Sequence, residues 1–270
     1  MTVAEKIQYL LKKERYCFED LVTVVEILRS DVGCPWDREQ DHKSIRKDLI
    51  EETYEVIEAI DTENPVLLRE ELGDVLLQVV FHARIEEEQK SFDINDVSNA
   101  ICAKLIHRHP HVFGDVLADT SDKVLSNWEK IKSEEKERRT VTDKLKAIPP
   151  MLPALMRAEK VGKKASCFDF ENKEAVMDKV CEELCELNEA IDRQKQEEIE
   201  EEMGDLLLTV TSLCRKLGVE PESALNKATD KFIDRFSVLE QAVICQKKNI
   251  NDMTMAELDA VWEEIKHKKL

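Results

Sequence analysis

The chain has 270 residues, enough for one large domain or two medium-sized domains that each bury a core. Six glycines and seven prolines allow long helices and disfavour a turn-rich β architecture. The net charge of −18 argues against binding to nucleic acid or to an anionic membrane. The eight cysteines form no C-x-x-C pair, segment 1–20 is too charged for a signal peptide, and no apolar run could span a membrane, so we expect a cytoplasmic protein.

Apolar residues at helical spacing predict an all-α chain. The prolines in segment 149–153 predict a stiff linker at 141–153. This linker separates an expected N-terminal module, 1–140, from a C-terminal module, 154–270. The expected helices span residues 1–30, 44–61, 65–88, 91–109, 119–138, 154–165, 172–193, 196–217, 222–247 and 254–268.

An acidic motif, E-E-x-x-E followed by E-x-G-D, occurs twice in the chain, and every acidic position recurs 131 residues later. Its charged positions are Glu52, Glu55, Glu71 and Asp74 in the first copy, and Glu183, Glu186, Glu202 and Asp205 in the second. Two basic and aromatic pairs also recur: Lys104 and Arg108 as Lys231 and Arg235, and Trp128 and Lys132 as Trp262 and Lys266. The repeat predicts two copies of one helical module.

Each acidic motif predicts four carboxylates that converge from two antiparallel helices, because residues three or four apart share a helix face. Such a cluster is unstable unless a cation neutralises it. An all-oxygen set suits Mg²⁺ first and Mn²⁺ second, and the matching chemistry is phosphoryl or nucleotidyl hydrolysis. A single acidic motif is typical of a solvated face, but the duplication and the apolar runs 75–80 and 206–210 favour sites at the edges of buried cores. Gly73 and Gly204 predict close helix approach or local bending.

Other readings of the same residues remain open. A di-iron bundle would use Glu-x-x-His, which occurs as Glu39/His42 after a turn and as Glu264/His267 at the C-terminus. The histidines of segment 107–111 lack a cysteine at zinc-ligand spacing and favour a turn after a helix. Lys231 and Arg235 share a helix face and could bind phosphate, whereas Trp262 could stack on a base; ordinary surface pairs and a core tryptophan are the alternatives.

Together these motifs resemble the MazG family of nucleoside triphosphate pyrophosphohydrolases, within the all-α NTP pyrophosphatase superfamily. The resemblance covers essentially the whole chain. The matching stretches are Gly33–Asp37, Leu49–Glu55, Glu71–Asp74, Arg108–Phe113, Leu152–Leu155 and Glu201–Asp205.

The resemblance implies Mg²⁺-dependent hydrolysis of nucleoside triphosphates to the monophosphate and pyrophosphate, with broad base tolerance and a role in removing noncanonical nucleotides. It implies catalytic metal ligands at Glu183, Glu186, Glu202 and Asp205, with the equivalent metal set at Glu52, Glu55, Glu71 and Asp74. It implies nucleotide contacts from Lys179, Glu182, Glu201, Lys231, Arg235, Trp262 and Lys266. It also implies homodimers in which partner modules complete four-helix-bundle cores.

The chain departs from the family pattern at two places. Glu198 stands where a basic residue is expected, and Ser166–Phe170 replaces the family's Val-Gly-Phe-Asp-Trp element. The C-terminal half is expected to be catalytic, yet both halves keep all four carboxylates. The alternatives are a narrower pyrophosphatase of the dUTP or dCTP type, and a non-catalytic helical regulatory dimer with a vestigial nucleotide site.

Overall fold

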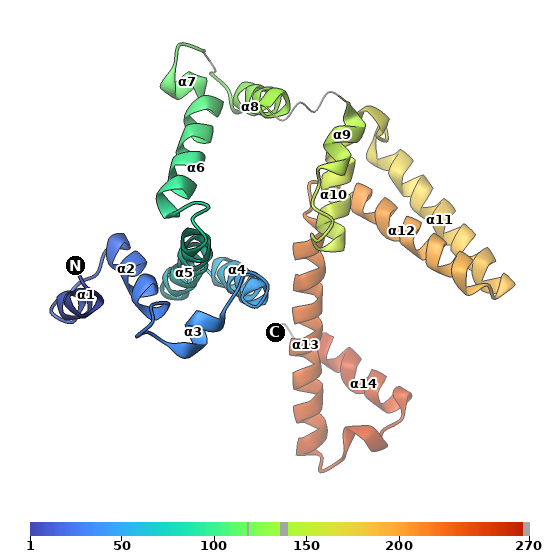
Figure 1. Cartoon of the computed structure of the whole chain (residues 1–270). Coiled ribbons are helices and arrows are strands. Elements are labelled where there is room, and N and C mark those ends of the chain that lie inside the picture. Colours follow the sequence, from blue (N-terminus) through green and yellow to red (C-terminus); the bar gives the residue numbers. More distant parts are fainter. Residues whose placement is uncertain (118, 136–139, 267–270) are drawn as a thin grey trace. The chain divides into compact units, whose positions relative to one another are not determined.

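The computed structural model describes residues 1–117, 119–135 and 140–266, and within these ranges it leaves out the side chains of residues 129, 133 and 134. Every regular element in these residues is a helix (Figure 1), which confirms the all-α prediction. The chain divides into two compact units, Met1–Lys132 and Ser133–Leu270. Each unit contains one copy of the acidic motif.

The N-terminal unit starts with two helices where the sequence predicted one continuous helix over 1–30. The break covers residues 11–17, and the second helix restarts where the Asp20 carboxylate accepts a hydrogen bond from the Cys17 backbone N–H at 2.8 Å. The Asp20 carboxylate also forms an ion pair with Lys13. The helices are α1 (Val3–Leu10), α2 (Phe18–Leu28), α3 (Pro35–Glu39), α4 (Arg46–Asp61), α5 (Pro65–Glu88), α6 (Ile94–Arg108), α7 (Pro110–Phe113) and α8 (Ser121–Glu135).

The C-terminal unit begins before the predicted linker, and part of that linker is helical. The Thr140 hydroxyl caps helix α9 by accepting a hydrogen bond from the Asp143 backbone N–H, and the Asp143 carboxylate accepts one from the Thr140 backbone N–H. The elements are α9 (Val141–Lys146), α10 (Ala154–Lys164), the 3₁₀ turn η1 (Ser166–Phe168), α11 (Lys173–Arg193), α12 (Gln196–Lys216), α13 (Pro221–Cys245), the 3₁₀ turn η2 (Ile250–Asp252) and α14 (Met255–Lys266). Residues 136–138 and 267–268 of two predicted helices lie outside the described ranges.

Two helical hairpins, α4–α5 and α11–α12, carry the acidic motifs and turn in the same way. Their helices pack against each other in both units. The turns use a left-handed residue at matching positions, Glu63 with φ 51° and Gln194 with φ 53°. Glu63 lies 131 residues before Gln194, so the backbone repeats in the register of the sequence. In the first hairpin Asn64 then caps α5, accepting hydrogen bonds from the N–H groups of Val66 and Leu67.

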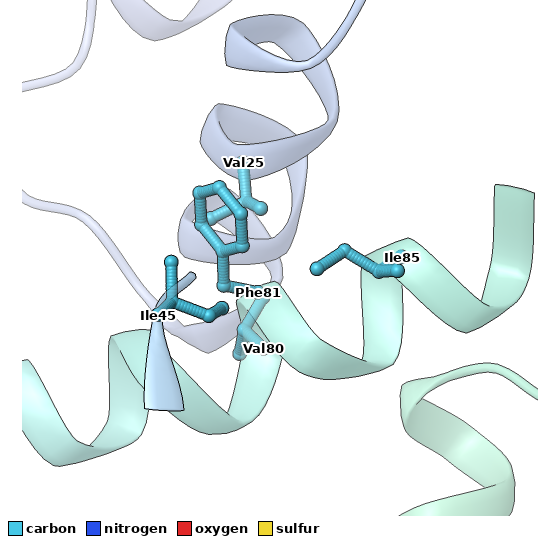
Figure 2. Close-up of a cluster of buried hydrophobic side chains, with 5 residues drawn as sticks. All are labelled: Val25, Ile45, Val80, Phe81 and Ile85. Carbon is cyan, nitrogen blue, oxygen red and sulfur yellow. The ribbon is translucent and has the colours of Figure 1, made fainter. Parts of the chain in front are cut away.

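The core of the N-terminal unit lies where α2 packs on α5. Val25 of α2 is completely buried, and it contacts a cluster that includes Ile45 and the α5 residues (Figure 2). The buried members are Val25, Ile45, Val80, Phe81 and Ile85. Arg29 lies over the Phe81 ring at 5.1 Å and pairs with Glu88 at 2.8 Å, which ties the end of α2 to the end of α5.

The C-terminal unit has a separate core between α13 and α14. Leu239 and Val243 of α13 pack against Ile265 of α14, and Trp262 borders this cluster. Helix α10 packs against both α12 and α13. The acidic hairpin α11–α12 and the pair α13–α14 are therefore distinct parts of the same unit (Figure 1).

The apolar runs behind the acidic motifs are less buried than the sequence predicted. Leu76 is 40% exposed and Leu207 is 51% exposed, because α2 and α10, which pack on α5 and α12 beside their hairpin partners, leave these parts of the two helices uncovered. The expected close approach at Gly73 and Gly204 is also absent: a Cβ atom at either position would meet no atom within 4 Å among the described residues. Both hairpins thus present an open apolar face.

Candidate functional site

The C-terminal hairpin brings three of its four predicted carboxylates together. Oxygen atoms of Glu183 and Glu186 on α11 and of Glu202 on α12 all lie within 4.8 Å of one another. Glu183 is 5% exposed, whereas Glu202 is half-buried and Glu186 is exposed, so the trio runs from the buried part of the hairpin to its surface. Three convergent carboxylates could hold a hard cation.

Asp205 is outside that trio but close enough to act on it. Burial is the main cause that raises the pKa of Glu202, and the negative charges of Glu186, Glu183 and Asp205 raise it further. The fourth carboxylate therefore contributes charge to the cluster without joining the three oxygens that lie within 4.8 Å.

The N-terminal hairpin repeats this geometry with Glu52, Glu55 and Glu71. Glu71 is 8% exposed, and burial together with a side-chain hydrogen bond shared with Glu55 raises its pKa. Burial and the charge of Asp74 raise the pKa of Glu52. Asp74, like Asp205, lies outside the trio and adds its charge.

One cation lies inside the C-terminal cluster. The Lys179 Nζ atom is 2.6 Å from Glu182, 3.0 Å from Glu183 and 3.8 Å from Glu186. The hydrogen bonds to Glu182 and Glu183 raise the pKa of Lys179. The sequence indicated this contact, because Lys179 precedes Glu182 and Glu183 by three and four positions on one helix. Glu201, the remaining predicted contact on this hairpin, is exposed.

The other predicted nucleotide contacts lie on α13 and α14. Trp262 meets Phe232 at a ring-centroid distance of 5.3 Å, and the two rings line an open apolar hollow of about 330 Å³. Lys231 and Arg235 form no ion pair with any described residue, whereas Lys266 pairs with Glu263 at 2.6 Å. No hydrogen bond or ion pair joins these residues to the acidic cluster within residues 140–266.

The corresponding residues of the N-terminal unit contact one another. Arg108 lies over the Trp128 ring at 5.1 Å, and the Lys132 ammonium lies over the same ring at 4.4 Å. Arg108 is buried. The aromatic surface that is partly open at Trp262 is therefore covered by cations at Trp128.

The two departures from the family pattern have local structural explanations. Glu198 pairs with Lys195 at 2.5 Å and with Arg193 at 3.3 Å, and these bonds lower its pKa. Asp169 accepts hydrogen bonds from the Arg215 guanidinium and lies 2.9 Å from the Lys216 ammonium, so it fastens the segment after α10 to the end of α12.

The histidines do not form a metal group among the described residues. The chain turns between α6 and α7 at His109, as the sequence indicated, and His109 bonds the Leu105 carbonyl at 2.6 Å. His42 contacts His82 and Glu86 rather than Glu39, and His267 lies outside the described ranges. All eight cysteines are free thiols, and no described helix is long and apolar enough to cross a membrane.

The helices and the two hairpins, each with three convergent carboxylates of which one is buried, define a class of tandem helical proteins with duplicated acidic centres. Comparison with known proteins identifies its family. The model of the MazG nucleotide pyrophosphohydrolase domain matches residues 40–113 and 171–238, which contain the two acidic trios. The chain belongs to the MazG family, which confirms the resemblance seen in the sequence and the tandem arrangement of its modules.

Full-length relatives agree with the domain match. The chain is 45% identical to the nucleoside triphosphate pyrophosphohydrolase/pyrophosphatase MazG of Thermotoga maritima, over 95% of this chain and 98% of that protein. It is 42% identical to the nucleoside triphosphate pyrophosphohydrolase of Escherichia coli K12, over 93% and 97% of the two chains. It is 39% identical to the uncharacterized protein YabN of Bacillus subtilis, over 95% of this chain and 53% of YabN.

Proposed function

We propose that this chain hydrolyses nucleoside triphosphates to the monophosphate and pyrophosphate, with Mg²⁺ or Mn²⁺ bound by the carboxylates of its C-terminal module, 154–270. The observation that carries the proposal is the trio of Glu183, Glu186 and Glu202, whose oxygens lie within 4.8 Å of one another on the two helices of a hairpin. The names of the Thermotoga maritima and Escherichia coli relatives support the reaction.

The donor set fits a divalent cation. It contains only oxygen ligands, and three carboxylates within 4.8 Å of one another gain from a bound positive charge. We assign Glu183, Glu186, Glu202 and Asp205 as ligands, and Glu52, Glu55, Glu71 and Asp74 as the equivalent N-terminal set. A bound Mg²⁺ would neutralise phosphate oxygens and polarise the phosphorus toward attack by water.

The basic and aromatic residues supply contacts that the carboxylates cannot make. Lys231 and Arg235 have no anionic partner among the described residues, so both are available to bind the phosphates of the departing pyrophosphate. Trp262 and Phe232 line the apolar hollow, which suits a stacked base. We also assign nucleotide contacts to Lys179, Glu182, Glu201 and Lys266.

Broad base tolerance follows from the lining of the hollow. Asp259 is its one charged member, and the others are apolar or aromatic. Stacking accepts any base, whereas discrimination between bases requires several fixed hydrogen-bonding groups. A site of this kind suits the removal of noncanonical nucleotides from the cellular pool.

We further propose that the working unit is a homodimer. The apolar faces of the hairpins are exposed in a single chain: Leu184 of α11 is 44% exposed, and Leu207 and Leu208 of α12 are 51% and 46% exposed. A second copy that packs on these faces would complete four-helix cores. It would also provide a route by which the residues of α13 and α14 reach an acidic cluster.

The direct test is to incubate the full-length protein with each nucleoside triphosphate and Mg²⁺ and to separate the products by ion-exchange chromatography. The proposal predicts monophosphate and pyrophosphate in equal amounts. Diphosphate with orthophosphate, or no turnover, would contradict it. Competition between ribonucleotides and deoxynucleotides, including dUTP and dCTP, separates a broad enzyme from a narrow one.

A further inference from the structure

The two acidic clusters differ at one position of the repeat. Lys179 precedes Glu183 by one helical turn, and the equivalent residue 131 positions earlier, one turn before Glu52, is Asp48. A positive charge beside one cluster is therefore a negative charge beside the other. The charge at this position, one turn before the trio, therefore differs by two units, whereas the preceding position carries the reverse exchange of Lys47 for Asp178.

In the C-terminal cluster, Lys179 occupies the place of a counter-ion. Its ammonium lies 3.0 Å from the buried Glu183 and 3.8 Å from Glu186, two of the three carboxylates of the trio. A divalent cation that binds this trio has to compete with an ammonium group that is already paired to it.

In the N-terminal cluster, no described Lys or Arg side chain forms an ion pair with a carboxylate of the trio. Glu71 is more than nine-tenths buried, points into the trio with Glu52 and Glu55, and forms no ion pair with a described Lys or Arg. The nearby charges that act on Glu52 are all negative, from Asp74, Glu55 and Glu71. Asp48 stands one helical turn before Glu52 on α4. A buried carboxylate without a cationic partner calls for a bound cation.

We infer that the two centres bind metal in different ways: the N-terminal trio holds a resident divalent cation without nucleotide, and the C-terminal trio takes its cation together with the nucleotide. In the second case the substrate phosphates draw Lys179 away from Glu183 and leave the carboxylates free. This inference rests on the proposed function for the role of nucleotide, but the nucleotide-free difference between the two trios stands on Lys179 and Asp48 alone.

The test is a titration of the metal-free, nucleotide-free full chain with Mn²⁺, in which electron paramagnetic resonance measures the unbound ion. We expect one tight site per chain and a second that is at least about tenfold weaker, because the Lys179 ammonium is paired with two carboxylates of the C-terminal trio and repels a divalent ion. The E71Q variant should remove the tight class, and the E202Q variant should remove the weak one. Circular dichroism of each variant checks its fold.

Two charge variants reverse the asymmetry without altering a carboxylate of either trio. K179M should strengthen the weak class at least about fivefold, and D48K should weaken the tight class by a similar factor. Equal affinity of the two classes in the unmodified chain, or a K179M titration that matches it, would overturn the inference. Product analysis on the same samples separates a failure of this inference from a failure of the proposed function. Normal pyrophosphate release with equal Mn²⁺ affinities refutes the inference alone. Asymmetric Mn²⁺ binding without turnover refutes the proposed function alone.

Discussion

The Arg215 guanidinium donates hydrogen bonds to both carboxylate oxygens of Asp169, and this pair is largely buried, with 15% and 16% of the two side chains exposed. The contact holds the pKa of Asp169 well below its usual range, with the Arg215 hydrogen bond as the largest cause. Because Asp169 follows α10 and Arg215 ends α12, the pair fastens a loop to the helix that carries Glu202.

Replacing Asp169 with Asn should therefore destabilise the C-terminal unit by about 2 kcal/mol, because the Arg215 charge would lose its partner. The measurement is urea unfolding in a W36F/W128F background, where the fluorescence of Trp262 reports on that unit alone. The exposed D230N variant is the matched control. Since the folded pKa is depressed, the contribution of Asp169 is present above about pH 4 and decreases as the pH falls below that value.

The His42 and His82 rings stack at a centroid distance of 5.0 Å, with their Nδ1 atoms 2.8 Å apart. Burial and the neighbouring His42 lower the pKa of His82. The unfolded chain therefore binds the proton more readily, and the contribution of His82 to stability should be full above about pH 6.5 and decrease as the pH falls through that value.

The H82N variant should accordingly show a weaker loss of stability of the N-terminal unit between pH 7.5 and pH 5.5 than the unmodified chain. Fluorescence of Trp36 and Trp128 in a W262F background follows the unfolding of this unit. The H109N variant is the control, because His109 lies at the α6–α7 turn instead. Parallel pH profiles for the unmodified chain and H82N would contradict the assignment.

The raised pKa of Glu202 predicts the opposite dependence in the metal-free C-terminal unit. A carboxylate whose folded pKa is raised contributes stability below its unfolded pKa of about 4.3, and that contribution is lost as the pH rises through the folded pKa. The metal-free unit should thus melt at a higher temperature at pH 5 than at pH 7.5, and E202Q should reduce this difference. Addition of Mn²⁺ should raise the melting temperature more at pH 7.5 than at pH 5.

The exposed apolar face of α12 predicts the effect of a charge on assembly. The L207D variant should raise the dimer dissociation constant about thirtyfold or more, the equivalent of about 2 kcal/mol for a buried interface anchor. Sedimentation equilibrium measures this directly. F168D is the control, because Phe168 is 95% exposed and lies outside the hairpin. A dimer of unchanged affinity in L207D would rule out this face as the interface.

Local sequence rules predicted most of the helices and part of the site. The spacing of Glu183 and Glu186 placed both on one face of α11, and the constant offset of 131 residues anticipated the matching turns at Glu63 and Gln194. Helix spacing could not reveal the break before α2, because there the Asp20 side chain competes through a cap and an ion pair with continuation of the helix.

Long-range features were harder to predict from the sequence. The apolar runs at 75–80 and 206–210 indicated buried helices, but burial depends on how many neighbours a helix has, and a hairpin supplies only one. The absence of Asp74 and Asp205 from the close trios depends on side-chain direction across the hairpin, which spacing along one helix does not determine.

The proposal that the C-terminal carboxylates carry the reaction is tested by the rate of pyrophosphate release from ATP with Mg²⁺. The variants to compare are E202A/D205A and the matched E71A/D74A, each checked for native helicity. We expect E202A/D205A to lose at least about a hundredfold in rate, because changes even in the outer shell of a metal centre cost about ten- to a hundredfold, and E71A/D74A to lose far less. A folded E202A/D205A variant that releases pyrophosphate at the unmodified rate would contradict the claim.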